Sequence, residues 1–283
     1  MRSLGEVLQI ATQFLQQKKI VRARRSVEDL LAFVLKKSRL DLYLQFDLPL
    51  EEKELEHFRS LIRRLSAKEP IEYILGRVEF YNCFFSLNSS VLIPRPETEI
   101  LLDHICRKIE KEERKPQTAW DICTGSGCLG ISLKKRFPFV KITLSDLCPD
   151  ALHVAHLNAK QNQVEVEILL GDLLKPFEGK RADLVICNPP YVSLSEYEGL
   201  DLSVKGFEPK QALVAEENGL LFYRLLSEQL PLFLNKGAKV YLEIGATQGQ
   251  KIKELFGHPC WTQVLIEKDL SGHDRFFFLE FES

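Results

Sequence analysis

Apolar residues recur at helical spacing in the first part of the chain. Three stretches place them on a single helix face: Leu4, Val7, Leu8, Ala11, Phe14 and Leu15; Val27, Leu30, Leu31 and Val34; and Leu55, Phe58, Ile62 and Leu65. Residues three and four apart lie on one side of a helix, so each stretch predicts an amphipathic helix, with Ser26 as the cap of the second. We therefore predict a small helical bundle over residues 1–75.

A short β-rich stretch follows Pro70, which interrupts the helical pattern. Val78–Leu87 is rich in aromatic residues and is broken at Asn82-Cys83, which is typical of a β-hairpin. We predict a hairpin linker over residues 76–95, with the domain boundary near residue 85, and a larger domain over residues 96–283.

The larger domain alternates short β-rich runs with helical segments. Seven runs predict strands: Ala119–Cys123, Val140–Ser145, Val164–Leu170, Ala182–Cys187, Val240–Ile244, Gln263–Ile266 and Arg275–Phe281. Several are apolar nearly throughout, as strands covered on both faces by helices are. The link between the last two is too short for a helical crossover, so this pair should be antiparallel. The predicted fold class is α/β, a seven-stranded Rossmann-like sheet with one reversed strand, preceded by the helical domain.

Composition agrees with a folded protein that does not enter a membrane. Of 283 residues, 45% are hydrophobic and 28% charged. No run approaches the ~20 apolar residues of a membrane span, and the start of the chain lacks a signal sequence, so we expect a cytoplasmic protein. The seven cysteines include no C-x-x-C pair, which argues against disulfides and a zinc site; we expect no metal.

Charge argues against a nucleic-acid substrate. Residues 1–85 carry 15 basic and 12 acidic side chains, and the remainder carries 23 basic and 28 acidic ones. A nucleic-acid enzyme concentrates cations around its cleft, whereas this larger domain is acidic. One basic cluster lies far from the predicted chemistry and is interpreted as a solvated helical face: Lys18, Lys19, Arg22, Arg24, Arg25, Lys36, Lys37 and Arg39.

A cofactor site is predicted where the first three strands end. Gly125 and Gly127 follow the first strand and let the backbone approach a ligand closely. Asp146 ends the second strand, where a carboxylate can accept both ribose hydroxyls, and Asp172 and Leu173 follow the third, where they suit an adenine ring. The turn lacks the third glycine of a dinucleotide site and the lysine of a P-loop, which favours S-adenosylmethionine. The predicted cofactor-binding residues are Cys123, Thr124, Gly125, Ser126, Gly127, Asp146, Asp172, Leu173 and Asn188.

The most specific feature is Asn188-Pro189-Pro190-Tyr191 at the end of the fourth strand. The prolines predict a rigid, extended corner. The side-chain oxygen of Asn188 and the carbonyl of Pro189 can accept both hydrogens of a planar NH2 group, while Tyr191 can stack on it. Positioning then carries much of the acceleration of an in-line methyl transfer. All four residues are predicted to be catalytic and to bind the substrate; Cys187 is interpreted as a buried strand residue, and His153 and His156 as surface residues.

These motifs resemble the release-factor glutamine methyltransferases of bacterial type. The resemblance extends over Pro70–Gly76, Glu79–Tyr81, Leu92–Glu99, Asp121–Gly127, Asn188–Tyr191, Phe207–Pro209, Glu243–Gly245 and Gly272–Phe276. It implies a helical amino-terminal domain that docks the substrate protein, a hairpin linker and a class I methyltransferase domain. The implied reaction is N5-methylation of the glutamine in the Gly-Gly-Gln motif of class I peptide chain release factors.

The resemblance also directs attention to particular positions. The family's first loop glycine is Cys123 here, which would be strained if the position needs positive φ. Arg95 and Thr98 are expected to border the amino-acid end of the cofactor. Apart from the resemblance, we expect 192–218 to form a lid over the substrate. We expect a monomer. The alternatives are an N6-adenine methyltransferase acting on DNA or RNA, a glutamine methyltransferase of a ribosomal protein, and a noncatalytic cofactor-binding protein.

Overall fold

The computed structural model describes residues 2–282, which form two compact units. One unit extends to Gly76 and also includes the segment Asp201–Phe207; the other comprises Arg77–Leu200 and the chain from Glu208 onward. None of the helices formed by residues 2–282 has the length and apolar character that crossing a membrane requires.

The first unit is a helical bundle around its own apolar core. Its helices are α1 (Leu4–Gln17), α2 (Ala23–Leu35), α3 (Arg39–Leu44), α4 (Glu52–Ser66) and α5 (Ile71–Leu75), and the segment Asp201–Phe207 adds α10 (Leu202–Lys205). Ser3 caps α1, and its side chain accepts the backbone N–H of Glu6. Leu4, Leu30 and Leu31 are completely buried in the core. The three predicted amphipathic helices are present.

The predicted cap of the second helix is wrong. Helix α2 begins at Ala23 after Arg22, which has left-handed φ, so Ser26 lies inside the first turns and is 8% exposed. The nearby Glu28 is also buried, where it accepts hydrogen bonds from Arg24, Arg39 and the hydroxyl of Tyr43. Serine is a good capping residue, but α2 extends further towards the amino terminus, where Ala23 is buried in the core of the bundle.

A two-stranded hairpin begins the second unit. Strands β1 (Arg77–Phe80) and β2 (Cys83–Ser86) pair antiparallel through the turn Tyr81-Asn82. Both turn residues have positive φ, as in a type I′ hairpin turn.

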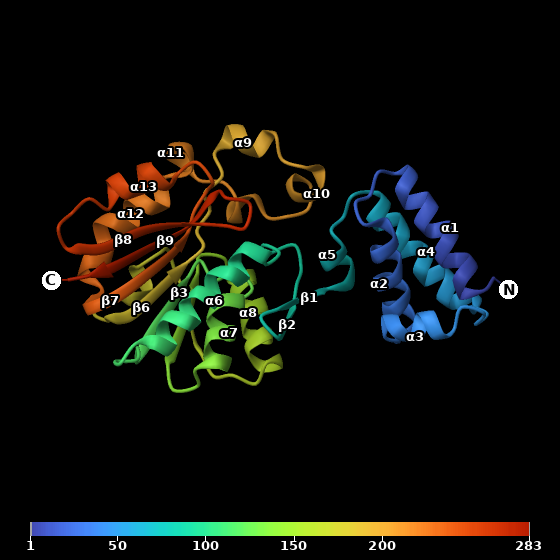
Figure 1. Cartoon of the computed structure of the whole chain (residues 1–283), viewed down its shortest axis with the longest axis horizontal. Coiled ribbons are helices and arrows are strands. Elements are labelled where there is room, and N and C mark those ends of the chain that lie inside the picture. The colour runs from blue at the N-terminus through green and yellow to red at the C-terminus, as the bar shows by residue number, and fades with distance from the viewer. Residues whose placement is uncertain (1, 283) are drawn as a thin grey trace. The chain divides into compact units, whose positions relative to one another are not determined.

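The second unit is built on a seven-stranded sheet, of which Figure 1 labels β3, β6, β7, β8 and β9. Its strands are β3 (Thr118–Ile122), β4 (Lys141–Asp146), β5 (Glu167–Leu170), β6 (Ala182–Cys187), β7 (Leu234–Glu243), β8 (Trp261–Lys268) and β9 (Asp274–Phe281). The order across the sheet is β5-β4-β3-β6-β7-β9-β8, and β9 is antiparallel to both of its neighbours. The prediction of seven strands with one reversed is confirmed.

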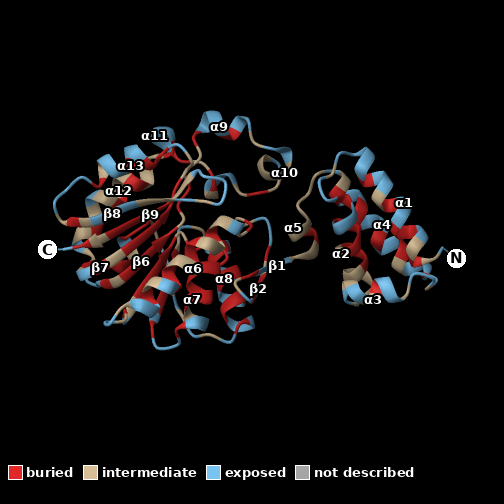
Figure 2. Ribbon diagram, in the orientation of Figure 1, coloured by how far each residue is buried: buried red, intermediate tan, exposed pale blue. Residues whose placement is uncertain are grey.

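Helices cover both faces of this sheet. Alternate residues of β6 belong to different cores: Leu184 and Ile186 pack on one face, and Val185 and Cys187 on the other. Figure 2 shows the central strands buried along most of their length. The helices of the first face are α6 (Pro96–Lys111), α7 (Cys128–Arg136) and α8 (Pro149–Gln161), and those of the second are α12 (Leu221–Gln229) and α13 (Gly249–Leu255).

Three strands differ from the sequence prediction by two or more residues at an end. Strand β8 spans Trp261–Lys268 rather than Gln263–Ile266. Strand β5 begins at Glu167 rather than Val164, because this edge strand pairs only with Thr143–Asp146 of β4. Strand β7 begins at Leu234 rather than Val240, and its register with β6 shifts between Ala182 and Leu184. The polar residues and the glycine at the start of β7 hide its strand character from a hydrophobic pattern.

The chain between β6 and α12 folds into short helices. They are α9 (Leu194–Glu198), η2 (Lys210–Ala212) and α11 (Glu216–Gly219), beside short turns η1 (Lys175–Phe177) and η3 (Leu230–Leu232) elsewhere in the unit. A parallel bridge between Val192 and Val214 brings the two ends of the segment together.

Candidate active site

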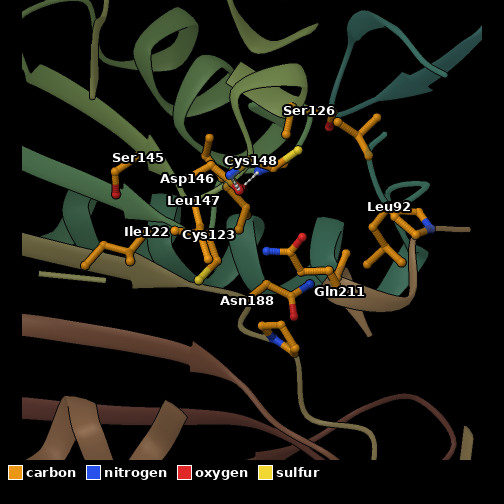
Figure 3. Close-up of a pocket in the computed structure, with 18 of the residues that line it drawn as sticks. Leu92, Ile122, Cys123, Ser126, Ser145, Asp146, Leu147, Cys148, Asn188 and Gln211 are labelled. Carbon is orange, nitrogen blue, oxygen red and sulfur yellow. Dashed lines mark hydrogen bonds between the residues drawn. The ribbon is translucent and has the colours of Figure 1, made fainter. Parts of the chain in front are cut away.

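A cavity lies at the carboxyl ends of β3, β4 and β6, the edge at which open α/β sheets bind ligands. Figure 3 shows Cys123, Asp146 and Asn188 around it. The predicted site residues that line it are Cys123, Thr124, Gly125, Ser126, Asp146, Asp172, Leu173, Asn188 and Pro190. Gly127, Pro189 and Tyr191 adjoin lining residues in sequence but do not line the cavity themselves.

The turn after β3 has the backbone that its glycines suggest. Gly125 has φ +54° and Gly127 has φ +82°, and a Cβ at Gly127 would lie 2.6 Å from Cδ1 of Ile131. Cys123 has φ +58°, so the position that is glycine in the resembling family does require a left-handed backbone here. A non-glycine residue in that region costs on the order of 1–2 kcal/mol, and Cys123 carries this strain directly beside the cavity.

Asp146 is held by backbone donors on both of its oxygens. Oδ2 accepts the N–H of Gly125 at 2.9 Å, and Oδ1 accepts the N–H of Cys148 at 3.0 Å. Burial raises the pKa of Asp146, and these backbone hydrogen bonds oppose the rise. A carboxylate oxygen can accept more than one hydrogen bond, so Asp146 keeps acceptor capacity for two neighbouring hydroxyls.

A second carboxylate, that of Asp121, holds the turn by hydrogen bonds. Asp121, which is 1% exposed, accepts the hydroxyl of Thr124 at 2.6 Å and the N–H of Gly130 at 2.8 Å through Oδ2. Burial raises the pKa of Asp121 from 3.8 to about 6, although both hydrogen bonds favour its charged form. Asp121 thus ties the glycine turn to the start of α7.

The cavity wall also contains two buried serine hydroxyls. Within residues 2–282, the hydroxyls of Ser126 and Ser145 are buried and have no hydrogen-bond partner, and both residues line the cavity. Buried polar atoms are nearly always satisfied, so these hydroxyls fit a polar ligand. Ile122, Leu147 and Leu173 add apolar walls suited to a planar ring. The residues therefore fit an adenosine-containing methyl donor.

Asp172 and Leu173 lie at the end of β5 as predicted. Leu173 is buried with φ +47°, and Asp172 is half-exposed and forms an ion pair with Lys175 at 2.8 Å. A ligand that uses the Asp172 carboxylate would share it with this lysine.

The Asn-Pro-Pro-Tyr corner is fixed on several sides. Asn188 lines the cavity, and its Nδ2 donates to the hydroxyl of Thr98 at 3.4 Å. The Tyr191 hydroxyl lies 3.3 Å from Oε1 of Glu243, and Nε2 of Gln248 donates to the Tyr191 carbonyl at 2.9 Å. A Cβ on Gly219 would lie 2.1 Å from that same carbonyl oxygen. The side chain of Tyr191 therefore points towards Glu243 instead of lining the cavity.

Sequence reasoning missed the acidic partners of this site. Glu208, from the predicted lid, accepts the N–H of Ile93 and forms an ion pair with Arg95, which lines the cavity with Thr98. Glu243 lies at the end of β7, and both acids stood only in segments of the family resemblance, with no role assigned to either. The signal for Glu243 was a carboxylate closing an apolar strand, the same signal that identified Asp146.

The remaining sequence interpretations concern two histidines, the cysteines and the predicted lid. His153 and His156 are exposed on α8, and Cys187 is completely buried. All seven cysteines are free in the described chain. Pro209 and Gln211 from the predicted lid line the cavity.

The seven-stranded sheet with one reversed strand is the fold of a class I methyltransferase. Its cavity contains the site of that class, with a glycine turn against a strand-end aspartate and an Asn-Pro-Pro-Tyr corner. Sequence relatives then narrow the class. The chain is 38% identical to a release factor glutamine methyltransferase of Chlamydia trachomatis, over 98% of this chain and 94% of the relative. It is also 38% identical to one of Bacillus cereus, over 98% and 99%. The chain belongs to the release factor glutamine methyltransferase family.

Family models agree with this assignment, and solved structures agree with the fold. The PrmC N-terminal domain matches residues 6–76, and the Methyltransferase small domain matches residues 96–201. The fold is similar to a methyltransferase from Pyrococcus furiosus, with TM-score 0.52 and 19% identity over 70% of this chain and 88% of that one. It is also similar to the 16S rRNA N2 G1207 methyltransferase of Thermus thermophilus, solved with AdoMet and guanosine, with TM-score 0.52 and 14% identity over 73% and 50%. At these identities the structures bear on the fold alone.

Proposed function

We propose that this enzyme transfers a methyl group from S-adenosylmethionine to the side-chain amide N5 of the glutamine in the Gly-Gly-Gln motif of class I peptide chain release factors. The observation that carries the proposal is Asn188, which lies in the same cavity wall as the Gly125 turn and Asp146. Family membership supports the substrate, and also a cytoplasmic site of action, where release factors work. We propose further that the enzyme acts as a monomer and that the helical unit docks the release factor.

The cofactor, when bound, supplies an electrophilic methyl on a sulfonium. In the proposed arrangement, Asp146 accepts the ribose hydroxyls, Leu173 packs on the adenine ring, and Ser126 and Ser145 complete the polar wall. Arg95 and Thr98 border the amino-acid end of the cofactor.

The chain's own residues orient the acceptor. Asn188 Oδ1 and the Pro189 carbonyl accept the two hydrogens of the glutamine amide, which weakens the conjugation of its nitrogen and directs the lone pair towards the methyl group. Oriented reactants reach effective molarities of about 10⁵–10⁸ M, so this positioning supplies a large part of the acceleration without a strong base. The methylated nitrogen then gives up one of its two hydrogens as a proton to water. Tyr191, whose hydroxyl is held by Glu243, limits the movement of the corner.

The decisive assay tests substrate and residue together. Purified enzyme and isotopically labelled cofactor are incubated with a class I release factor, with its glutamine-to-alanine variant, with a ribosomal protein substrate, and with DNA and RNA. Peptide mass spectrometry then locates the label. Label on the Gly-Gly-Gln glutamine alone is expected, and label on a nucleic acid or on the ribosomal protein instead would overturn the proposed substrate.

Asn188→Ala should lower kcat at least about 100-fold, the usual loss when one preorganised polar group is removed from a reacting centre. The Kd of the cofactor, measured by calorimetry, should change little. Asn235→Ala is the matched control. Asn235 donates to Asp183 near the amino end of β6, at the other end of the strand from Asn188, so this variant should retain full turnover. Normal turnover by Asn188→Ala would remove the assigned role.

A further inference from the structure

The amide of Asn188 has a donor end and an acceptor end, and only one of them can face the substrate usefully. An NH2 group presented by a glutamine needs the Oδ1 end. Nothing in the amide itself selects that orientation, because the two ends have nearly the same shape. A neighbouring group must therefore set it.

The neighbour of this amide is Thr98 on α6, which is 2% exposed. Its hydroxyl lies 3.4 Å from Nδ2 of Asn188 and 2.6 Å from Oε2 of Glu243, which is 1% exposed. A threonine hydroxyl has one hydrogen to donate. The short contact to a carboxylate oxygen uses that hydrogen, so the hydroxyl can only accept from Asn188.

This polarity fixes the direction of the amide. Nδ2 of Asn188 must point towards Thr98, which leaves Oδ1 for the cavity. The sheet brings Glu243 close to Asn188 and Thr98, although Thr98 and Glu243 lie 145 positions apart in sequence. Cys187 pairs with Leu242 in the register of β6 and β7, so Asn188 and Glu243 leave neighbouring strands at the same level.

We propose that Glu243 is a positioning residue for methyl transfer, which orients the Asn188 amide through the Thr98 hydroxyl and holds Tyr191 through its own second oxygen. This inference rests on the proposed function, because it assumes that Asn188 Oδ1 receives the amide hydrogens of the substrate. Glu243 touches neither substrate nor cofactor in this arrangement, and it acts through its two neighbours.

The surroundings of Glu243 suit this role. Burial raises its pKa, but hydrogen bonds from Thr98 and Tyr191 and the positive charge of Arg275 oppose the rise. Burial also raises the pKa of Tyr191, which keeps its hydroxyl neutral and able to donate. Nη1 of Arg275 lies 3.4 Å from the Tyr191 hydroxyl and also donates to the carbonyl of Ile244 at 3.1 Å. Thr98 of α6 and Tyr191 of the corner therefore donate to one carboxylate, and Arg275 of β9 adds a positive charge nearby.

The test compares Thr98→Val with Thr98→Ser. Valine keeps the shape of threonine and removes the hydroxyl, whereas serine keeps the hydroxyl and removes the methyl. We expect Thr98→Val to lower kcat about 10- to 100-fold, the scale of a misplaced reacting group, and Thr98→Ser to recover most of that loss. Glu243→Gln should also lower kcat, because a neutral amide can donate to Thr98 and reverse the polarity of the relay. The KM for the release factor should stay within about threefold, since the cavity keeps its shape. Because Thr98 also borders the cofactor, kcat is measured at saturating cofactor, so that a weaker Kd does not lower it.

Thr143→Val is the matched control. Thr143 is a buried threonine whose hydroxyl donates to Glu167 at 2.9 Å, away from the cavity, so its loss should leave kcat unchanged. Urea midpoints followed by tryptophan fluorescence establish that each variant is folded. If Glu243→Gln does not fold, the pair at Thr98 still decides the question.

The outcomes distinguish a failure of the proposed function from a failure of the positioning role of Glu243. No transfer to the release factor glutamine by the unaltered enzyme refutes the proposed function. Transfer by the unaltered enzyme with normal kcat in Thr98→Val, or an equal loss in Thr98→Val and Thr98→Ser, refutes only the positioning role. A loss of kcat that Thr143→Val shares would likewise show that the effect is a general consequence of removing a buried hydroxyl.

Discussion

The buried carboxylate of Asp121 makes the stability of the methyltransferase unit depend on pH in a direction opposite to that of most carboxylates. Its pKa is raised from 3.8 to about 6, chiefly by burial, with a small contribution from the charge of Asp146. Two hydrogen bonds, from Thr124 and Gly130, do not compensate, and within residues 2–282 its Oδ1 has no hydrogen-bond partner. The folded state therefore binds this proton more tightly than the unfolded chain does.

The magnitude follows from the size of the pKa difference. A shift of about two units corresponds to about 3 kcal/mol, at about 1.4 kcal/mol per unit. This stability is fully present below pH 3.8, where both states are protonated, and is lost as pH rises through about 6. Asp121→Asn removes the titration. The unfolding free energy of the variant, minus that of the wild type, should therefore rise by about 3 kcal/mol between about pH 3.5 and about pH 7.

Urea unfolding at a series of pH values measures this difference. Both tryptophans of the chain, Trp120 and Trp261, belong to the methyltransferase unit, so their fluorescence reports the unfolding of that unit. Other titrating groups contribute equally to both proteins and cancel. The change with pH is the prediction, and the absolute stability of the variant is not.

Asp183→Asn provides a control of the opposite sign. Burial raises the pKa of Asp183, but hydrogen bonds from Asn235, Gln117 and Thr118 outweigh it and the net pKa is lowered. Its stabilisation is present above its unfolded pKa and is lost as pH falls through the folded value, so the cost of Asp183→Asn should shrink in acid. A pH-independent difference for Asp121→Asn, or one that follows the sign of Asp183→Asn, would refute the reasoning.

Two further predictions concern residues beside the glycine turn. Gly130→Ala places a Cβ 2.3 Å from Cδ2 of Leu144 and 3.0 Å from Oδ2 of Asp121, so it should lower the unfolding free energy by about 1–3 kcal/mol in the same urea assay. A variant as stable as the wild type would show that α7 moves freely on the sheet. Asp146→Ala removes a charged acceptor and leaves the N–H groups of Gly125 and Cys148 unpaired, so calorimetry should show cofactor affinity about 100-fold weaker. Unchanged affinity would exclude Asp146 from the cofactor site.

The sequence predicted best what one strand and its following turn determine together. The Gly125 turn, Asp146 and Asn188 each follow an apolar run, and parallel strands bring such positions to one edge of a sheet. The same locality explains the error at Ser26. A capping residue was visible in sequence, but the packing that extends α2 back to Ala23 was not.

Partners that lie far apart in sequence could not be paired from sequence alone. Thr98 and Glu243 meet because α6 packs over the end of β7, and neither spacing nor polarity along the chain specifies that contact. The orientation of Tyr191 towards Glu243, instead of along the cavity wall, is a consequence of the same network. The sequence therefore indicated which corner holds the acceptor group but not what keeps the corner rigid.

The position of β9 between β7 and β8 separates the supports of the two halves of the site. The glycine turn and Asp146 are held by β3 and β4, which do not pair with β9, whereas Tyr191 meets Arg275 from that final strand. The pocket for the nucleoside and the corner that presents the acceptor nitrogen therefore depend on different strands, so a substitution in β9 can loosen the corner and leave the nucleoside pocket intact.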